Sequence, residues 1–200
     1  MSAQAGRSAS RPLVLASASP QRRAILARLG IVFEVRPTDV EELAEGDPQA
    51  VALQNALLKA RAAADPQRDE LVLGCDTLVE MGGRIYGKPV DQDAARETLR
   101  ALAGATHTVI SGLALLDETG ERTTLARTSV SFRELAPSTI DWYLDTGEWR
   151  DRAGGYAIQG AGAALVREIS GDYENVVGLP LAALLDLHPM LLSPSPEPAG

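Results

Sequence analysis

The stretch Leu13-Val-Leu-Ala-Ser-Ala-Ser-Pro-Gln-Arg-Arg23 decides the fold class, because it joins a strand directly to a helix. Its first four residues are apolar, which is typical of a short, fully buried strand. Ser19 can cap the helix that follows, and Pro20 suits its first position. The apolar stripe of that helix ends with Leu29, and Gly30 is a stop signal. A strand that feeds a helix through so short a turn predicts an α/β protein.

Strand and helix patterns alternate along the rest of the chain. Strands are expected at 31–36, 70–75, 77–81, 84–86, 107–116, 122–132 and 163–169. Helices are expected at 49–64, 92–103, 137–146 and 180–187. The segments 107–116 and 122–132 should form a long antiparallel pair, whereas helices separate several of the other strands. We therefore expect an α/β fold with a mixed, twisted sheet and flanking helices.

Composition narrows the range of functions. The net charge of −8 makes the chain a poor binder of nucleic acid polymers, so a polyanionic ligand needs a local cluster of positive groups. No apolar run reaches the roughly 18 residues that a membrane span requires, so no membrane partner is expected. The N-terminus lacks the apolar segment of a secretion signal, and the one cysteine, Cys75, fits a reducing compartment. We therefore expect a cytoplasmic protein.

The length of 200 residues suits a single domain with a sizeable core. We expect residues 1–11 to be a disordered lead-in and residues 12–189 to form that domain. Residues 190–200 contain several Pro and Ser residues, so we expect a disordered tail there.

The turn between the first strand and its helix is a candidate anion site. Free backbone N–H groups and the helix dipole favour negative charge at a helix N-terminus. Ser17 and Ser19 can donate hydroxyl hydrogen bonds, and Arg22 can bind a phosphate through two N–H groups. An ordinary capped helix with surface arginines would have the same sequence, so the turn alone leaves both interpretations open.

Three further residues could share a cleft with this turn. Asp76 follows an apolar strand and could bind a divalent cation or orient a water, or simply close a turn. Lys88 lies twelve residues beyond Asp76, across one hairpin, and Lys59 lies on a helix. These are the only two lysines beside 17 arginines, so they could be retained for their compact ammonium group or be there by chance. Gln159, in a Gly-rich segment, could recognise a base edge through its amide.

Other catalytic classes fit the sequence less well. The Gly-x-Ser-x-Gly turn of many hydrolases is missing. His107 and His188 have no metal-binding spacing around them, and we expect both to be structural or surface residues. Cys75 lies inside an apolar strand, where an inert core residue is expected.

Five motifs occur here in the order in which they occur in Maf proteins, a family of nucleoside triphosphate pyrophosphatases. They are Leu15-Ala-Ser-Ala-Ser-Pro-Gln-Arg22, Gly74-Cys-Asp-Thr77, Gly87-Lys-Pro-Val-Asp91, Ala153-Gly-Gly-Tyr-Ala-Ile-Gln-Gly160 and Gly171-Asp-Tyr-Glu-Asn-Val-Val-Gly-Leu-Pro180. Together they cover about residues 13–187. The segment Tyr156-Ala-Ile-Gln-Gly160 resembles the branch that acts on dTTP and UTP.

This resemblance implies an elongated, two-lobed fold with a central cleft, related to inosine-triphosphate pyrophosphatases, and a chain able to form a homodimer. The implied reaction converts a nucleoside triphosphate to the monophosphate and pyrophosphate with a divalent cation, Mg²⁺ or Mn²⁺. The implied general base is Asp76, which would share the cation with Glu42. Substrate-binding positions are Ser17, Ser19, Arg22, Lys59 and Lys88. Positions linked to base selectivity are Gln21, Thr77 and Gln159.

Two departures affect the expected ranking of substrates. Many family members have Arg at the position of Gln21, and Arg152 stands where Lys is common. Two other functions also fit the motifs: a non-catalytic nucleotide-binding regulator of cell division, and a pyrophosphatase that prefers the purine triphosphates ITP or XTP.

Overall fold

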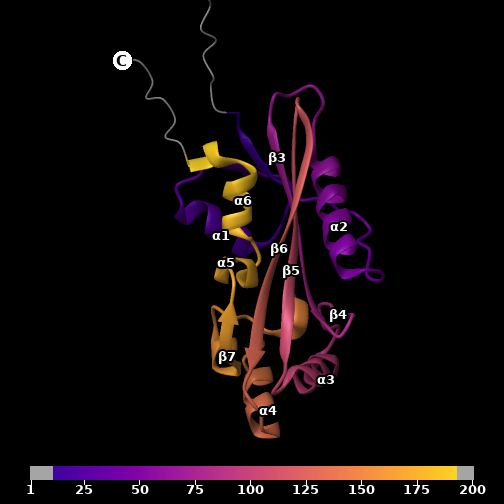
Figure 1. Ribbon diagram of the computed structural model, residues 1–200, viewed down its shortest axis with the longest axis vertical. Helices are drawn as coiled ribbons and strands as arrows, with labels where there is room; N and C mark the ends of the chain where they lie inside the picture. Colours follow the sequence, from indigo (N-terminus) through magenta and orange to yellow (C-terminus); the bar gives the residue numbers. More distant parts are fainter. Residues whose placement is uncertain (1–10, 193–200) are drawn as a thin grey trace, which may run out of the picture.

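The computed structural model describes residues 11–192, which form an elongated α/β molecule (Figure 1). The strands are β1 (Leu13–Leu15), β2 (Phe33–Val35), β3 (Leu71–Met81), β4 (Arg84–Tyr86), β5 (Thr106–Asp117), β6 (Gly120–Phe132) and β7 (Val166–Ser170). The α-helices are α1 (Pro20–Arg28), α2 (Pro48–Ala63), α3 (Gln92–Leu102), α4 (Pro137–Asp145), α5 (Tyr173–Val177) and α6 (Leu181–Leu187). Short 3-10 helices are η1 (Ala153–Gly155), η2 (Ala161–Leu165) and η3 (Pro189–Leu192).

All seven strands belong to one sheet of mixed direction. The main order is β2-β1-β3-β5-β6-β7, and β4 pairs with β3 off this path. The strands β2, β1 and β3 run parallel, whereas β5, β6 and β7 continue the sheet in antiparallel pairs. The predicted α/β fold with a mixed sheet and flanking helices is therefore confirmed. The predicted long pair is β5 and β6, which spans most of the length of the molecule (Figure 1).

Alternate residues of β1 and β3 face different helices. One set, which includes Leu15, Leu73 and Cys75, packs with α1 and α6. The other set, which includes Val14 and Val72, packs against the small side chains of α2. Figure 1 shows α2 on one side of these strands and α1 and α6 on the other. Because side chains alternate along a strand, Asp76 and Thr77 of β3 must face opposite sides of the sheet.

The core has two main parts along the length of the sheet. One part lies around β1, the first half of β3, α1 and α6. The other lies around the end of β3, α3 and α4, and contains Tyr143, Trp149 and Phe132. The long strand β5 contributes side chains to both parts, so the two lobes share one sheet.

Capping residues and a pair of glycines, all expected from the sequence, account for several boundaries of helices and strands. The Ser19 hydroxyl accepts a hydrogen bond from Arg22 N at 3.4 Å and caps α1. Asp91 caps α3 by accepting from Ala94 N at 2.8 Å. Gly82 and Gly83 adopt φ values of 62° and 81° between β3 and β4, as the expected hairpin turn requires.

The main differences from the prediction are the length of β3, the start of β7 and one helix that was not predicted. The strand β3 continues from Leu71 to Met81, so Asp76 lies in its middle and not at its end. The apolar run of 70–75 and the alternation of 77–81 belong to one strand, because pairing with β5 continues from Val72 to Glu80. Residues 163–165 lie in η2, and β7 begins at Val166. The short helix α5 was not predicted; Asp172 caps it by accepting from Glu174 N at 2.8 Å.

Only part of the predicted lead-in and of the predicted tail lies among the described residues. Arg11 of the predicted lead-in is described and forms ion pairs with Asp69 and Glu118. The first residues of the predicted tail belong to η3, and Leu191 packs against the core. The rest of the lead-in and of the tail, residues 1–10 and 193–200, lie outside the described residues.

Candidate active site

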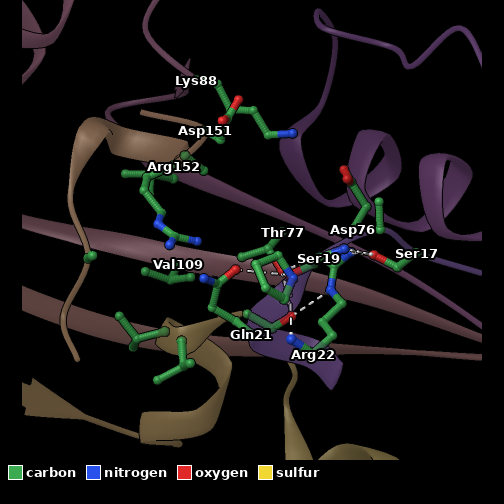
Figure 2. Close-up of a pocket in the computed structure, with 18 of the residues that line it drawn as sticks. Ser17, Ser19, Gln21, Arg22, Asp76, Thr77, Lys88, Val109, Asp151 and Arg152 are labelled. Carbon is green, nitrogen blue, oxygen red and sulfur yellow. Dashed lines mark hydrogen bonds between the residues drawn. The ribbon is translucent and has the colours of Figure 1, made fainter. Parts of the chain in front are cut away.

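The site lies at a gap along one edge of β3. On that edge β1 pairs with Leu71–Leu73, and β4 pairs with Val79–Met81. Between these two partners, Gly74–Leu78 has no neighbouring strand on that edge in the described part of the chain. A cavity of about 520 Å³ opens at the gap, and it is lined from both faces of β3, since it contacts Asp76 as well as Thr77 (Figure 2).

The turn after β1 forms one wall of the cavity. Ser19 N donates to Ser17 Oγ at 3.2 Å, and the Ser19 hydroxyl donates to Gln21 Oε1 at 3.1 Å. Both serines and Gln21 line the cavity together with the N-terminus of α1. The N–H groups of Ser19 and Arg22 already donate to the serine hydroxyls, so it is mainly the helix dipole that favours an anion at this wall.

Arg22 is more deeply embedded than a surface phosphate-binding arginine would be. It is 8% exposed, and its Nε donates to Gly178 O at 2.8 Å. Its two Nη atoms donate to Ser17 Oγ at 3.0 Å and to Thr77 Oγ1 at 3.2 Å. These bonds use three of the five N–H groups of the guanidinium. Arg22 therefore joins the turn after β1 to β3 and to Gly178, and two of its N–H groups are left over from these bonds.

Asp76 is the buried carboxylate of the cavity and is bonded on both oxygens. Lys59 Nζ lies 2.6 Å from Asp76 Oδ1 and 3.0 Å from Glu42 Oε1. Asn55 Nδ2 donates to Asp76 Oδ2 at 3.1 Å. Asn55 and Lys59 are four residues apart on α2, so both project from the same face of that helix.

Two glycines allow α2 to come this close to the sheet. A Cβ atom at Gly74 would lie 2.1 Å from Ala56 O, and one at Gly112 would lie 2.3 Å from Ala52 O. Gly112 is the residue of β5 that pairs with Asp76. The absence of both Cβ atoms brings the helix backbone against β3 and β5, which places Asn55 and Lys59 within bonding distance of Asp76.

The opposite wall comes from the loop after β4 and from the segment around η1. Gly154 N donates to Gly87 O at 3.1 Å, and this bond joins the two segments. Figure 2 shows the Lys88 ammonium extending into the cavity on the side of Asp76, and the Arg152 guanidinium extending into it on the side of Thr77. Arg152 Nε is buried and has no hydrogen-bond partner among the described residues.

The remaining wall is mostly apolar. Val109, Val176 and Val177 line it, together with Tyr156 and Ala157. Thr77 lies beside it, with its hydroxyl 2.8 Å from Ser111 Oγ. Gln159 also contributes to the lining. Such a surface suits the flat face of a base or another small ring, with polar groups at its margin.

The structure thus brings all ten predicted site residues into one cavity. Sequence reasoning missed Asn55, Thr38 and the apolar wall; only the four-residue spacing between Asn55 and Lys59 could have indicated the first of these. It noted Arg152 but gave it no role. Three Asp or Glu residues and five Lys or Arg residues line the cavity, so it carries a positive excess inside an acidic protein.

A divalent cation could be held by few protein groups. No cluster of three or more His, Cys, Asp or Glu residues with metal-binding geometry occurs within residues 11–192. Glu42 and Asp76 converge on the same Lys59 ammonium and provide two carboxylates. Mg²⁺ is commonly held by one or two carboxylates together with substrate phosphates, so this donor set fits a cation that arrives with a nucleotide.

His107, His188 and Cys75, for which no catalytic role was expected, do not line this cavity. Burial lowers the pKa of His107 to about 4, and its Nε2 bonds the Tyr156 hydroxyl at 2.9 Å. His188 follows α6 and is partly buried. Cys75 is buried, and burial raises the pKa of its thiol. The predictions that His107 is structural and that Cys75 is a core residue are confirmed.

The helix N-terminus, the positive lining and the apolar wall define a site for a ligand that carries both phosphate and a ring. The Maf-like protein family matches residues 12–189, and the chain belongs to that family.

Curated relatives agree with this assignment. A dTTP/UTP pyrophosphatase of Moorella thermoacetica is 50% identical over 179 residues, which cover 88% of this chain and 92% of the relative. Proteins of the same name from Deinococcus radiodurans and Pyrococcus furiosus are 42% and 43% identical, each over 88% of this chain and over 90% and 93% of their own lengths. Among the described residues, no helix is long and apolar enough to cross a membrane.

Proposed function

We propose that this chain hydrolyses a pyrimidine nucleoside triphosphate, dTTP or UTP, to the monophosphate and pyrophosphate. The observation that carries the proposal is a positively lined cavity with a buried carboxylate, Asp76, in a chain of net charge −8. The names of the relatives give the same activity to proteins that match nearly the whole domain.

The triphosphate would lie along the gap in the sheet. Its phosphates would meet the N-terminus of α1 and the side chains of Ser17, Ser19 and Arg22. Lys59 and Lys88 would neutralise charge on the β- and γ-phosphates, which leave together as pyrophosphate. Such fixed positive groups stabilise the negative charge that develops in phosphoryl-transfer transition states.

Asp76 would orient or deprotonate the water that attacks the α-phosphorus. Its carboxylate is held on both oxygens, by Lys59 and Asn55, so its direction is fixed before substrate binds. Glu42 and Asp76 would hold a divalent cation, Mg²⁺ or Mn²⁺. When bound, such a cation offsets charge on the phosphate oxygens.

The base would lie against the apolar wall of Val109, Val176 and Val177. Gln21, Thr77 and Gln159 would provide the polar contacts that distinguish one base from another. Gln21 brings an uncharged amide where many family members have Arg, and Arg152 has a free, buried Nε at this end of the cavity. The cytoplasmic location and a homodimer remain predictions.

A panel of triphosphates tests the proposal. Purified protein with Mg²⁺ or Mn²⁺ should release monophosphate and pyrophosphate from dTTP and UTP faster than from CTP, ITP or XTP. Nucleotide binding without pyrophosphate release would instead indicate a regulator, and preference for ITP or XTP would indicate a purine enzyme. Either result would overturn the proposal.

Asp76→Asn tests the role of the carboxylate. The isosteric amide retains the space but cannot act as a base, and positioned bases contribute about 10²–10⁴-fold to rate. We expect kcat to fall by that range with little change in the thermal unfolding midpoint. Turnover like that of the wild type would remove Asp76 from the mechanism.

A further inference from the structure

Asn55 contacts both Asp76 and the backbone of the segment that carries Glu42. It lies on α2 and is 2% exposed. Its Nδ2 donates to Asp76 Oδ2 at 3.1 Å and to Leu43 O at 3.0 Å, while its Oδ1 accepts from Leu43 N at 2.8 Å. One side-chain amide therefore binds both backbone groups of Leu43 and the catalytic carboxylate.

These contacts use the full donor capacity of the amide. A primary amide has two N–H groups, and here one goes to Leu43 and the other to Asp76. The Leu43 N–H fixes which end of the amide is oxygen, so the N–H groups must point at Leu43 O and at Asp76. An aspartate at this position would have no donor for either acceptor, and an aliphatic residue would leave all three partners unpaired.

Leu43 follows Glu42 directly, in a stretch between β2 and α2 without regular secondary structure. Glu42 is itself held to Lys59, and Lys59 to Asp76. Two parallel links therefore run from α2 to this stretch and to Asp76, one through Asn55 and the other through Lys59. If the Lys59 ammonium turns to a phosphate, its ion pairs with Glu42 and Asp76 must lengthen. The Asn55 amide is uncharged and is not drawn to a phosphate in this way, so its bonds to Leu43 and Asp76 can remain.

We propose that Asn55 is a positioning residue, which holds Asp76 and the backbone beside Glu42 in one fixed arrangement for the reaction. This inference rests on the proposed function for its catalytic consequences. Its structural content is independent of substrate: the two carboxylates keep their mutual geometry because one amide bonds both segments. Residues that orient metal ligands or bases in this way commonly affect metal affinity or activity by 10–100-fold.

Asn55→Ala is the main variant, and Asn175→Ala is its matched control. Asn175 is also a buried asparagine, with Nδ2 donating to Val109 O at 3.1 Å and Thr128 Oγ1 at 3.0 Å, but it contacts neither Asp76 nor Glu42. Thermal unfolding measures what each loss costs the fold. We expect similar falls in the unfolding midpoint for the two variants, and a kcat at least tenfold lower for Asn55→Ala alone, with KM changed less than threefold.

A double-mutant cycle separates a positioning role from general loosening of the fold. Because a large part of the effect of Asn55 would pass through Asp76, Asn55→Ala should lower kcat by a smaller factor in the Asp76→Asn background than in the wild type. An equal loss in both backgrounds, or an equal loss of kcat in Asn175→Ala, would overturn the proposal. If Asn55→Ala does not fold, Asn55→Ser keeps one donor in a smaller side chain and is subject to the same criteria.

Mn²⁺ binding without nucleotide distinguishes failure of this inference from failure of the proposed function. Electron paramagnetic resonance reports free Mn²⁺ directly, whether or not the protein turns over a triphosphate. We expect Mn²⁺ affinity to fall about tenfold in Asn55→Ala and to stay unchanged in Asn175→Ala. Unchanged Mn²⁺ affinity in Asn55→Ala would overturn the proposal, whereas a missing pyrophosphatase activity in the wild type would overturn only the proposed function.

Discussion

Gly74→Ala should damage both the stability and the activity of this protein, although Gly74 is not among the residues that line the cavity. The added Cβ would lie 2.1 Å from Ala56 O, 2.8 Å from Ala60 Cβ and 2.9 Å from Ala60 N. Ordinary contact begins near 3.4 Å, so the backbone of α2 would have to retreat by more than 1 Å. Overpacking typically costs 1–3 kcal/mol, and because backbone cannot yield as a side chain can, we expect about 3 kcal/mol.

For a domain of this size, a loss of about 3 kcal/mol corresponds to a fall of about 6–12 °C in the unfolding midpoint. The same retreat would stretch the bonds that Asn55 and Lys59 make with Asp76, which measure 3.1 and 2.6 Å. We therefore expect kcat to fall at least tenfold in the protein that remains folded.

Differential scanning calorimetry and a pyrophosphate-release assay below the unfolding range check the two effects separately. Gly87→Ala is the stability control, since a Cβ there meets nothing within 4 Å. A Gly74→Ala protein with the midpoint and kcat of the wild type would refute the reasoning, because α2 would then not be held at the distance that the site requires.

Three further predictions concern single side chains. Lys59→Arg should lower kcat/KM at least tenfold in the same assay, because a planar guanidinium cannot replace a compact ammonium between two carboxylates; an unaltered value would contradict this role. Burial lowers the pKa of His107 to about 4, so the unfolded chain binds the extra proton first and stability should fall by up to about 3 kcal/mol as pH drops from 6.5 to 4. Urea unfolding across that range should show a shallower loss for His107→Gln; an identical slope would exclude His107 as its source. Cys75 should resist a thiol reagent in native protein and react in denaturant, because burial raises the pKa of its thiol; rapid native labelling would contradict its burial.

The fold was predictable where short-range chemistry decides it. Ser19 and Asp91 cap their helices, and Gly82 with Gly83 supplies the turn between β3 and β4, because each of these residues acts within a few positions of itself. The extent of β3 was not predictable in this way. Its two halves have different hydrophobic patterns, since the first half is covered on both faces by helices and the second borders a cavity. Only the unbroken pairing with β5 from Val72 to Glu80 makes them one strand.

The sequence predicted many of the residues that line the cavity, but not how they are arranged in space. The motifs that carry the family resemblance contain or adjoin most of the lining, whereas no local pattern shows that Asp76 and Thr77 lie on opposite faces of one strand. Nor does the sequence show that three N–H groups of Arg22 donate hydrogen bonds within the protein. The first follows from the pairing of β3 with β5, which makes both residues part of one strand, and the second from the packing of Ser17, Thr77 and Gly178 around one guanidinium. The cavity itself opens at the gap between β1 and β4, which depends on where strands far apart in the sequence stop pairing.

The same gap explains how an acidic chain can offer a positive site. A carboxylate inside a regular sheet would be surrounded by strands, but at Asp76 the β1 side of the edge is open, and α2 approaches from one face without a Cβ at Gly74 or Gly112. Lys59 reaches Asp76 from that helix, while Lys88 extends from beyond β4 and Arg22 from α1 (Figure 2). Cationic side chains from three separate elements therefore meet at the edge of β3 where, among the described residues, Gly74–Leu78 pairs with no strand. Backbone packing fixes the positions of these side chains. The protein as a whole can therefore be acidic, while a triphosphate in the cavity would meet a positive local field.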